Sequence, residues 1–183
     1  DLHRRRHSFP TRRSSDLERL IELLQLETGK AKSHAFEEAA GAYGAARYFG
    51  KITEKALKSK RTKAGVPLLT KTWVEHAPVG VVGVITPWNY PLALTMLDVL
   101  PALAAGNTVV QKADNQTALT VLFARHLAIE AGLPEAAWTI VVGGGAEVGN
   151  AITDSCDYVA FTGSTATGKL VAERAAKRLI GYS

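Results

Sequence analysis

The stretch from residue 78 to residue 117 constrains the fold of this chain more than any other. It opens with β-branched residues from Val79 to Ile85, which predict a fully buried strand. The strand is expected to stop at Thr86 and Pro87, because proline has no N–H group to give to a sheet. Leucine-rich residues 92–104 then predict a helix that is apolar almost all round.

A second buried strand is predicted from Thr108 to Gln111, so the whole stretch reads as a βαβ unit with parallel strands and a right-handed crossover. Ligands of such sheets bind at the carboxyl ends of the strands, where Asn89 and Lys112 stand. An amide there can donate to a developing oxyanion, and an ammonium can bind ribose hydroxyls or phosphate. The alternative is that Asn89 only closes a turn and Lys112 is a solvated strand end.

A second candidate site lies near the carboxyl end of the chain. Residues 157–162 predict another strand, and the sequence GSTATG from Gly163 to Gly168 joins it to a helix that ends near Leu179. This arrangement presents backbone N–H groups and the positive end of a helix dipole to phosphate, and Ser164 and Thr165 add hydroxyl groups. The alternative is a simple helix cap in a tight turn.

Two helices are predicted ahead of the βαβ unit. Residues 17–27 form an amphipathic pattern with Asp16 as its cap, and the alanine-rich residues 31–57 predict a second helix. We expect the second helix to pack through Phe36, Ala39, Ala40, Tyr43, Ala46 and Tyr48. The lysine-rich residues 51–63 are interpreted as a solvated helix end and loop, and residues 66–75 as a hairpin or extended pair.

A glycine-rich run follows a predicted helix at residues 118–131 and a short predicted strand at residues 138–142. The helix is expected to turn Leu119, Leu122, Phe123, Leu127 and Ile129 inward. The run from Gly143 to Gly149 resembles a dinucleotide loop, although Val148 stands where the third glycine of GxGxxG is required. Gly145 and Gly149 are therefore weak candidates for cofactor contacts.

The basic character of the chain is concentrated in its head. The net charge is +5, but residues 1–16 hold five arginines against two aspartates, and 17 basic and 15 acidic residues remain without them. We therefore expect no nucleic-acid partner, and residues 1–16 are interpreted as a non-native or disordered basic leader. No apolar run reaches the roughly 20 residues of a membrane helix, so no membrane partner is expected.

The cysteine and histidine content excludes two further classes of site. Cys156 is the single cysteine, which rules out an internal disulfide framework and, with no signal peptide evident, predicts a cytoplasmic protein. His126 has no second histidine at position i+4, so no metal site is predicted. Cys156 lies just before a buried strand and is interpreted as structural.

The segment from Val79 to Leu92 together with GSTATG resembles the aldehyde dehydrogenase superfamily, in the order and at about the spacing of that family. The resemblance covers residues 17–183 and includes an ETGK turn in the helical pair. It implies an α/β fold in which helices precede a Rossmann-like parallel-sheet domain for NAD(P), truncated, with the catalytic domain absent. The family's nucleophilic cysteine and its glutamate base are then expected beyond the chain end, and the fragment alone is expected to be inactive.

The resemblance also implies roles for individual residues. Asn89 becomes the oxyanion-stabilising catalytic residue, in a reaction where a cysteine attacks the aldehyde and hydride passes to the nicotinamide before the thioester is hydrolysed. The implied cofactor-binding residues are Thr86, Pro87, Trp88, Asn89, Lys112, Asp114, Asn115, Gly145, Gly149, Gly163, Ser164, Thr165 and Gly168. A homo-oligomer is implied for the complete enzyme.

Two finer expectations concern the substrate and the cofactor. The motifs NYPL, QTAL, GSTATG and RLIGYS are most similar to the succinate-semialdehyde dehydrogenase branch. Asn115 stands where the family often has a glutamate that holds the ribose of NAD, and an amide does not repel a 2′-phosphate, which favours NADP. Asp114 is close by and weakens that preference, so NAD stays open.

Two other classes of function stay open at this point. GSTATGK nearly fits the P-loop pattern of nucleotide-binding proteins, but Leu170 occupies the position of the magnesium-binding Ser or Thr. The other alternative is a dinucleotide-binding module that catalyses nothing.

Overall fold

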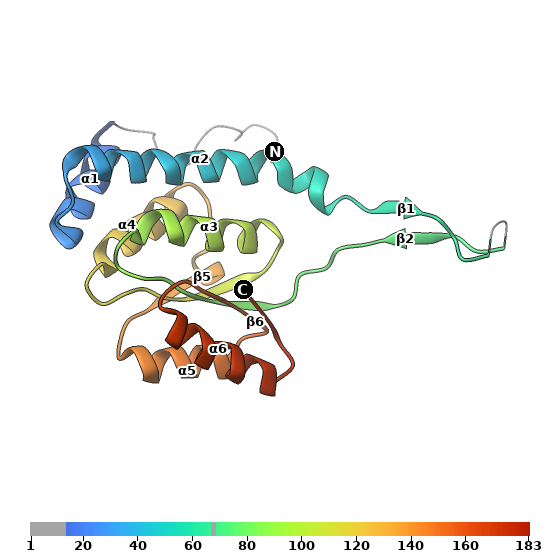
Figure 1. Ribbon diagram of the computed structural model, residues 1–183. Helices are drawn as coiled ribbons and strands as arrows, with labels where there is room; N and C mark the ends of the chain where they lie inside the picture. The colour runs from blue at the N-terminus through green and yellow to red at the C-terminus, as the bar shows by residue number, and fades with distance from the viewer. Residues whose placement is uncertain (1–13, 67–68) are drawn as a thin grey trace.

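A computed structural model of the chain describes residues 14–66 and 69–183 and shows an α/β fold in layers (Figure 1). Its helices are α1 (Ser14–Thr28), α2 (Lys32–Leu57), α3 (Pro91–Ala104), α4 (Ala118–Glu130), α5 (Gly145–Ser155) and α6 (Thr165–Lys177), with a short 3₁₀ turn at Glu135–Ala137. Its strands are β1 (Lys60–Thr62), β2 (Thr72–Val74), β3 (Val81–Ile85), β4 (Thr108–Lys112), β5 (Trp138–Val141), β6 (Tyr158–Phe161) and β7 (Gly181–Tyr182).

The central sheet has the strand order β5-β4-β3-β6-β7, and all its neighbouring strands pair in parallel. Ile85, the last residue of β3, lies opposite Lys112 on one side and Phe161 on the other. The carboxyl ends of the three neighbouring strands therefore stop at one level, and the loops that follow them start side by side. The predicted βαβ unit and Rossmann-like sheet are confirmed.

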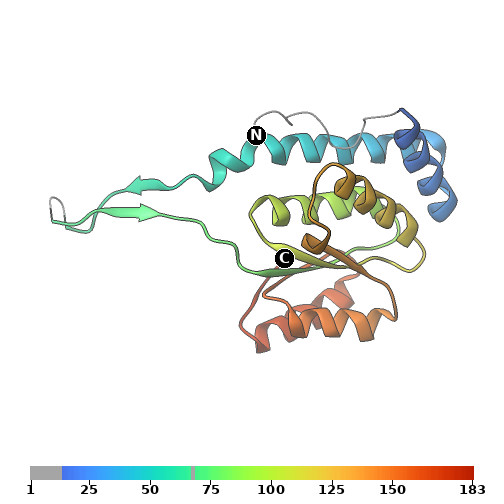
Figure 2. The same ribbon diagram turned by 180° about the vertical axis from the view of Figure 1, so that it is seen from behind.

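Helices cover both faces of this sheet. In Figure 1 and in the reverse view of Figure 2, α1, α2, α3 and α4 lie on one face and α5 and α6 on the other. The chain thus leaves β3 toward one face and β6 toward the opposite face, although the two strands are neighbours. Such a reversal opens a crevice at the carboxyl ends of the two strands, which is where ligands of open α/β sheets bind.

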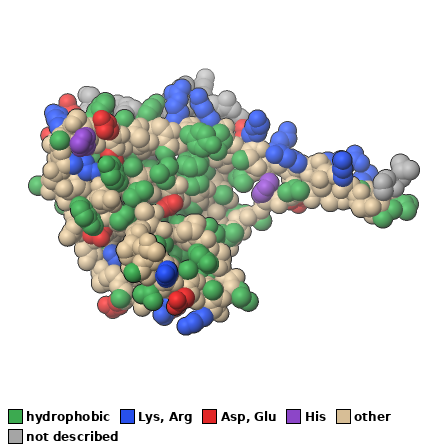
Figure 3. All heavy atoms as spheres, viewed as in Figure 1, with side chains coloured by type: hydrophobic (Ala, Val, Ile, Leu, Met, Phe, Trp, Pro, Cys, Tyr) green, Lys and Arg blue, Asp and Glu red, His purple; other side chains and the backbone are tan. Residues whose placement is uncertain are grey.

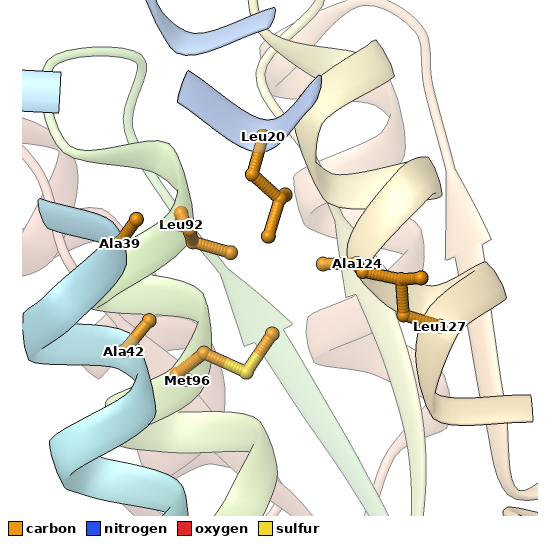
Figure 4. A pocket seen from close by; sticks show the side chains of 7 residues that line it. All are labelled: Leu20, Ala39, Ala42, Leu92, Met96, Ala124 and Leu127. Atoms are coloured by element: carbon orange, nitrogen blue, oxygen red, sulfur yellow. The ribbon is translucent and has the colours of Figure 1, made fainter. Parts of the chain in front are cut away.

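The helical pair α1 and α2 is packed onto α3 and α4 through small and apolar side chains. Where the four helices meet, a cavity of only about 10 Å³ remains (Figure 4). It is lined by Leu20, Ala39, Ala42, Leu92, Met96, Ala124 and Leu127. Because so little space is left between these helices, the pair forms one core with the sheet domain.

The strands β1 and β2 form an antiparallel arm that projects from the layered body (Figures 1 and 2). The predicted hairpin is thus present, but its first strand lies inside the lysine-rich stretch, earlier than expected. All residues of both strands are exposed, and Lys and Arg side chains follow α2 and continue along the arm (Figure 3). Of the helices in the described residues, none is long and apolar enough to cross a membrane.

The expected packing face of α2 was largely wrong. Phe36, Tyr43 and Tyr48 are 52%, 39% and 57% exposed, and the buried residues are Ala35, Glu38, Ala39 and Ala42. Alanine has no bulk beyond Cβ, so this face lets α2 approach α3 closely, and larger aromatic rings are turned outward. Leu119 and Leu122 of α4 are likewise exposed, against the expectation.

Other differences concern the ends of elements. Helix α1 begins at Ser14, so Asp16 is not its cap. Asp16 lies in the first turn, where its negative charge interacts favourably with the positive end of the helix dipole. Most of the predicted leader lies outside the described residues. Helix α5 and strand β7 were not predicted. Gly143, at φ +150°, and Gly144 lead into α5 directly after β5.

Candidate functional site

The loop after β3 presents Asn89 at the carboxyl edge of the sheet. Thr86 is buried and extends the ladder, since its N–H donates to the carbonyl of Lys112 at 3.3 Å. Trp88 is 51% exposed, and Asn89 is exposed as well. Among the residues that the structure describes, the Asn89 side chain has no hydrogen-bond partner, so its amide is available to a ligand. Pro91 then opens α3 as its first residue.

Lys112 ends the neighbouring strand with an almost buried ammonium group. Its side chain donates to the carbonyl of Ala113 at 3.1 Å, and within residues 14–66 and 69–183 no carboxylate forms a salt bridge with it. A buried ammonium that uses one of its three donors retains capacity for ligand oxygens. Its position and donor set fit the ribose hydroxyls or phosphates of a dinucleotide.

The two residues predicted to read the ribose, Asp114 and Asn115, have different partners. Asp114 accepts from the N–H of Gln116 at 3.0 Å and shapes the turn after β4. Asn115 accepts through Oδ1 from the N–H of Gly143 at 2.9 Å, which ties this turn to the loop after β5. With Oδ1 engaged, the group that Asn115 has left to offer is its NH₂ donor.

The glycine turn after β6 leads into α6 as predicted. Ser164 is the N-cap of α6, and its Oγ accepts from the N–H of Thr167 at 3.2 Å. The N–H groups of Thr165 and Ala166 in the first turn have no intrahelical acceptor and suit an anion. Gly163 is required by packing, because a Cβ there would stand 2.6 Å from the ring of Phe161.

The glycines of the run after β5 are separated by the start of α5. Gly145 is the first residue of α5 and is exposed. Gly149 is buried in the middle of the helix, where a Cβ would lie 3.8 Å from Ile85 of the sheet. The structure therefore gives Gly149 a place in helix packing, and its contact with a cofactor stays a prediction.

Most of the predicted residues thus gather along one edge of the sheet. Asn89 and Ser164 follow β3 and β6, and Lys112 is the last residue of β4. The three strands are neighbours in the sheet and end at one level. The hydroxyl of Thr86 is turned the other way, since Gln111 donates to it at 3.0 Å inside the core.

Gln111 centres a buried polar network that sequence reasoning missed. Its Nε2 donates to Thr86 and to Thr95 at 2.6 Å, and its Oε1 accepts from the indole N–H of Trp138 at 3.0 Å. Every polar atom of the Gln111 side chain is therefore paired. The signal was a glutamine inside an otherwise apolar strand, which is uncommon unless partners are provided.

Two carboxylates of the helical pair cap helices of the sheet domain, and both were missed. Glu38 accepts from the N–H groups of Leu92 and Ala93 at 2.9 and 3.2 Å, at the start of α3. Glu27 accepts from the N–H groups of Leu119 and Thr120 at 2.8 and 2.7 Å, at the start of α4. Glu38 stood in the sequence within the alanine stripe at helical spacing, which was the available signal.

Cys156 does not belong to this edge of the sheet. It follows α5 and precedes β6, at the opposite ends of the strands, and only 2% of it is exposed. Burial raises the pKa of its thiol, and the nearby carboxylate of Asp157 raises it further. Both effects disfavour the thiolate, and the burial supports the structural interpretation of Cys156.

Outside this edge, an exposed ion pair joins α5 and α6. The guanidinium of Arg174 donates to the carboxylate of Asp154 and lowers the pKa of that carboxyl group. His126 is exposed and lies 3.6 Å from Glu130 on the same helix. In the part of the chain that the structure describes, no cluster of three His, Cys, Asp or Glu residues is placed to hold a metal ion.

Comparison with known proteins gives relatives and structural neighbours of one kind. One relative is a protein of Mycolicibacterium smegmatis named "Putative succinate-semialdehyde dehydrogenase (NADP(+))". It is 50% identical over 164 residues, which are 90% of this chain and 32% of that protein. An "Aldehyde dehydrogenase" of Emericella nidulans is 39% identical over 88% of this chain and 32% of its own length. The chain therefore spans about a third of the length of these curated relatives.

Solved structures share the fold. The crystal structure of an E. coli NADP dependent enzyme superposes with a TM-score of 0.87 at 33% identity, over 91% of this chain and 35% of that one. Betaine aldehyde dehydrogenase of Staphylococcus aureus in complex with NAD+ gives 0.86 at 32% identity, over 92% and 34%. The model of the Aldehyde dehydrogenase family matches residues 11–183. With this match over nearly the whole chain, and with Asn89 and the glycine turn at adjoining strand ends, the chain belongs to the aldehyde dehydrogenase family.

Proposed function

We propose that this chain forms the dinucleotide-binding part of an NAD(P)-dependent dehydrogenase that oxidises an aldehyde to the carboxylic acid. The observation that carries the proposal is the exposed amide of Asn89, which forms no hydrogen bond with the described residues. It stands at the crevice between β3 and β6, with Lys112 and the start of α6 beside it. The reaction needs hydrogen-bond donors for the substrate oxygen and for the cofactor, and these groups lie together at one edge of the sheet.

Asn89 would act on the substrate oxygen. When a nucleophile adds to an aldehyde, negative charge develops on the carbonyl oxygen, and a fixed amide N–H stabilises that charge more than it stabilises the neutral aldehyde. The amide is held on a short loop between a buried strand and the first turn of α3, so little reorganisation is required.

Lys112, Ser164 and the first turn of α6 would hold the cofactor, which accepts hydride when bound. The Lys112 ammonium suits ribose hydroxyls, and the N–H groups at the start of α6 suit the pyrophosphate. Trp88 and Pro87 border Asn89 and would line the nicotinamide end. Thr165, Gly163 and Gly168 shape the turn that admits the phosphates.

The proposed nucleophile lies outside these 183 residues. Cys156 is the single cysteine, it is buried, and it lies at the wrong ends of the strands. A thiolate carried by a further segment is the group that the family chemistry requires, and the length of the relatives leaves room for one.

Succinate semialdehyde is the proposed substrate and NADP the proposed cofactor, since the relatives at 49–50% identity carry both in their names. Asn115 supports NADP in a second way, because its Oδ1 is bonded to Gly143 and leaves an NH₂ group to face a 2′-phosphate. The P-loop alternative loses support, since Leu170 is 66% exposed and has no oxygen for magnesium.

The test measures reduction of NADP and NAD by succinate semialdehyde, using the complete protein that carries this segment. Asn89→Ala is expected to lower kcat by roughly 100- to 1000-fold while the Kd for NADP, followed by tryptophan quenching, stays nearly constant. Lys112→Met should instead weaken NADP binding. Loss of cofactor binding in Asn89→Ala, or undiminished kcat, would contradict the roles assigned to these two residues.

A further inference from the structure

We propose that Lys30 and Glu38 are positioning residues for Asn89, reaching the catalytic loop from the helical pair outside the sheet. The inference rests on the proposed function, in which the Asn89 amide donates to the substrate oxygen. It assigns a role in catalysis to two side chains that touch neither substrate nor cofactor.

The ammonium of Lys30 is bound on three sides. It forms a salt bridge with Glu38, donates to the backbone carbonyl of Asn89 at 2.9 Å, and lies 4.3 Å from the centre of the Tyr90 ring. Only 11% of the Lys30 side chain is exposed. A lysine so enclosed is held in one conformation, and it fixes the peptide group between Asn89 and Tyr90.

Glu38 fixes the other end of the same loop. Its side chain is fully buried, one oxygen pairs with Lys30, and the other accepts from the N–H groups of Leu92 and Ala93. A carboxylate at the start of α3 also interacts favourably with the positive end of the helix dipole. The loop is therefore held at residue 89 by the lysine and at residues 92 and 93 by the glutamate.

The consequence concerns the direction of the Asn89 side chain. Its amide has no hydrogen bond of its own in the described residues, so its position is set by the backbone that carries it. That backbone is fixed through its carbonyl group, which leaves the amide free for a ligand. An oxyanion donor must lie within a few tenths of an ångström of its productive position, and a misplacement of about 1 Å can cost about 100-fold in rate.

The seam between α2 and α3 does not depend on this ion pair alone. Ala35, Ala39 and Ala42 are buried against α3, and Leu92 and Met96 close the seam (Figure 4). Removing Lys30 is therefore expected to release the loop while the helices stay packed. Since a buried carboxylate without its partner is costly, the variant Lys30→Met/Glu38→Gln removes both charges together.

The experiment measures steady-state kinetics of the complete dehydrogenase with NADP and aldehyde. Lys30→Met and Lys30→Met/Glu38→Gln are expected to lower kcat roughly 10- to 100-fold, with KM and the Kd for NADP changed by less than about threefold. Lys30→Arg should recover part of the loss. Lys32→Met and Glu37→Gln, exposed neighbours on α2, are the matched controls and should match the unaltered enzyme.

A double-mutant cycle separates positioning from a general structural effect. If Lys30 acts through Asn89, Lys30→Met should cost nothing further in an Asn89→Ala background, whose backbone carbonyl is intact. The inference would be overturned if the losses of kcat caused by Lys30→Met and Asn89→Ala multiplied in the double variant. It would also be overturned if kcat were unchanged in both Lys30→Met and Lys30→Met/Glu38→Gln.

Amide exchange gives a readout that does not depend on catalysis. The N–H groups of Leu92 and Ala93 should exchange at least about tenfold faster in Lys30→Met/Glu38→Gln than in the Lys32→Met control. If the unaltered enzyme oxidises no aldehyde, the proposed function is wrong. If the enzyme is active but the variants change neither the amide exchange rates nor kcat, only the positioning role is wrong.

Discussion

Asp98, on α3, shows how burial acts on a single carboxyl group. Desolvation raises its pKa above the ordinary value of 3.8, so the folded chain binds this proton more tightly than the unfolded chain does. The resulting destabilisation is absent below the ordinary carboxyl pKa and grows as the pH rises through the raised value.

Asp98→Asn is therefore expected to increase the free energy of unfolding at pH 7, and the gain should vanish as the pH falls to about 3.5. Urea unfolding of the two chains across this range measures the difference. Glu22→Gln, at an exposed position on α1, is the control and should change little. A gain that is equal at both ends of the range would show that burial of the charge is not its cause.

Cys156 gives a prediction about reactivity at the same scale. Its thiol is buried among Ile85, Ile152 and Val159, and its pKa is raised. A thiol reagent at pH 8 should modify the folded chain at least about tenfold more slowly than the chain in urea. Rapid stoichiometric modification of the folded chain would show that the α5–β6 junction opens far more readily than the packing indicates.

At the scale of elements, the capping of α4 by Glu27 can be tested directly. Glu27→Ala removes the acceptor of the N–H groups of Leu119 and Thr120, and also that of the Thr120 hydroxyl at 2.6 Å. We expect a loss of about 1–2 kcal/mol in the free energy of unfolding. Thermal and urea unfolding measure it, with Glu22→Ala as the control, and equal stability of the two variants would contradict the capping role.

The elements that sequence predicted best are those whose signal is local. A β-branched run, a proline break and a leucine-rich helical pattern, all within 40 residues, predict β3, α3 and β4. Helix α5 was missed because it begins on the last of three consecutive glycines. Their low helix propensity is outweighed by packing of Ile152 and Val148 against the sheet.

The parts of the site that sequence did not predict depend on distant partners. Asn89, Lys112 and Ser164 could be predicted to lie at one edge of the sheet because each stands at or shortly after the end of a strand. The partners of Glu38 and Glu27 lie 54 and 92 residues further along the chain, and no periodicity connects them. The exposed aromatic residues of α2 were misplaced for a similar reason, since only the approach of α3 decides that alanine faces inward.

At the scale of the whole molecule, the arm formed by β1 and β2 projects from the layered body and carries exposed apolar side chains. Leu69, Trp73 and Val74 are 84%, 51% and 46% exposed on it. Apolar side chains on a projecting hairpin suit a contact with another subunit, so the homo-oligomer expected for the complete enzyme would be joined through this arm.

Trp73→Lys is expected to shift the complete enzyme to smaller assemblies, because a buried interface does not accept an unpaired charge. Sedimentation velocity measures the change, and Lys63→Ser, at an exposed position of the same arm, should leave the assembly intact. An unaltered distribution in Trp73→Lys would place the subunit contact elsewhere.

The capping of α3 and α4 by the helical pair has a consequence for synthesis on the ribosome. α1 and α2 are translated before α3 and α4, yet Glu38 meets its partners only when Leu92 and Ala93 have emerged, and Glu27 only when Leu119 and Thr120 have followed. Until then the two carboxylates stay hydrated and the alanine stripe of α2 has nothing to cover it. The helical pair is thus expected to settle only after the helices that follow it have been made.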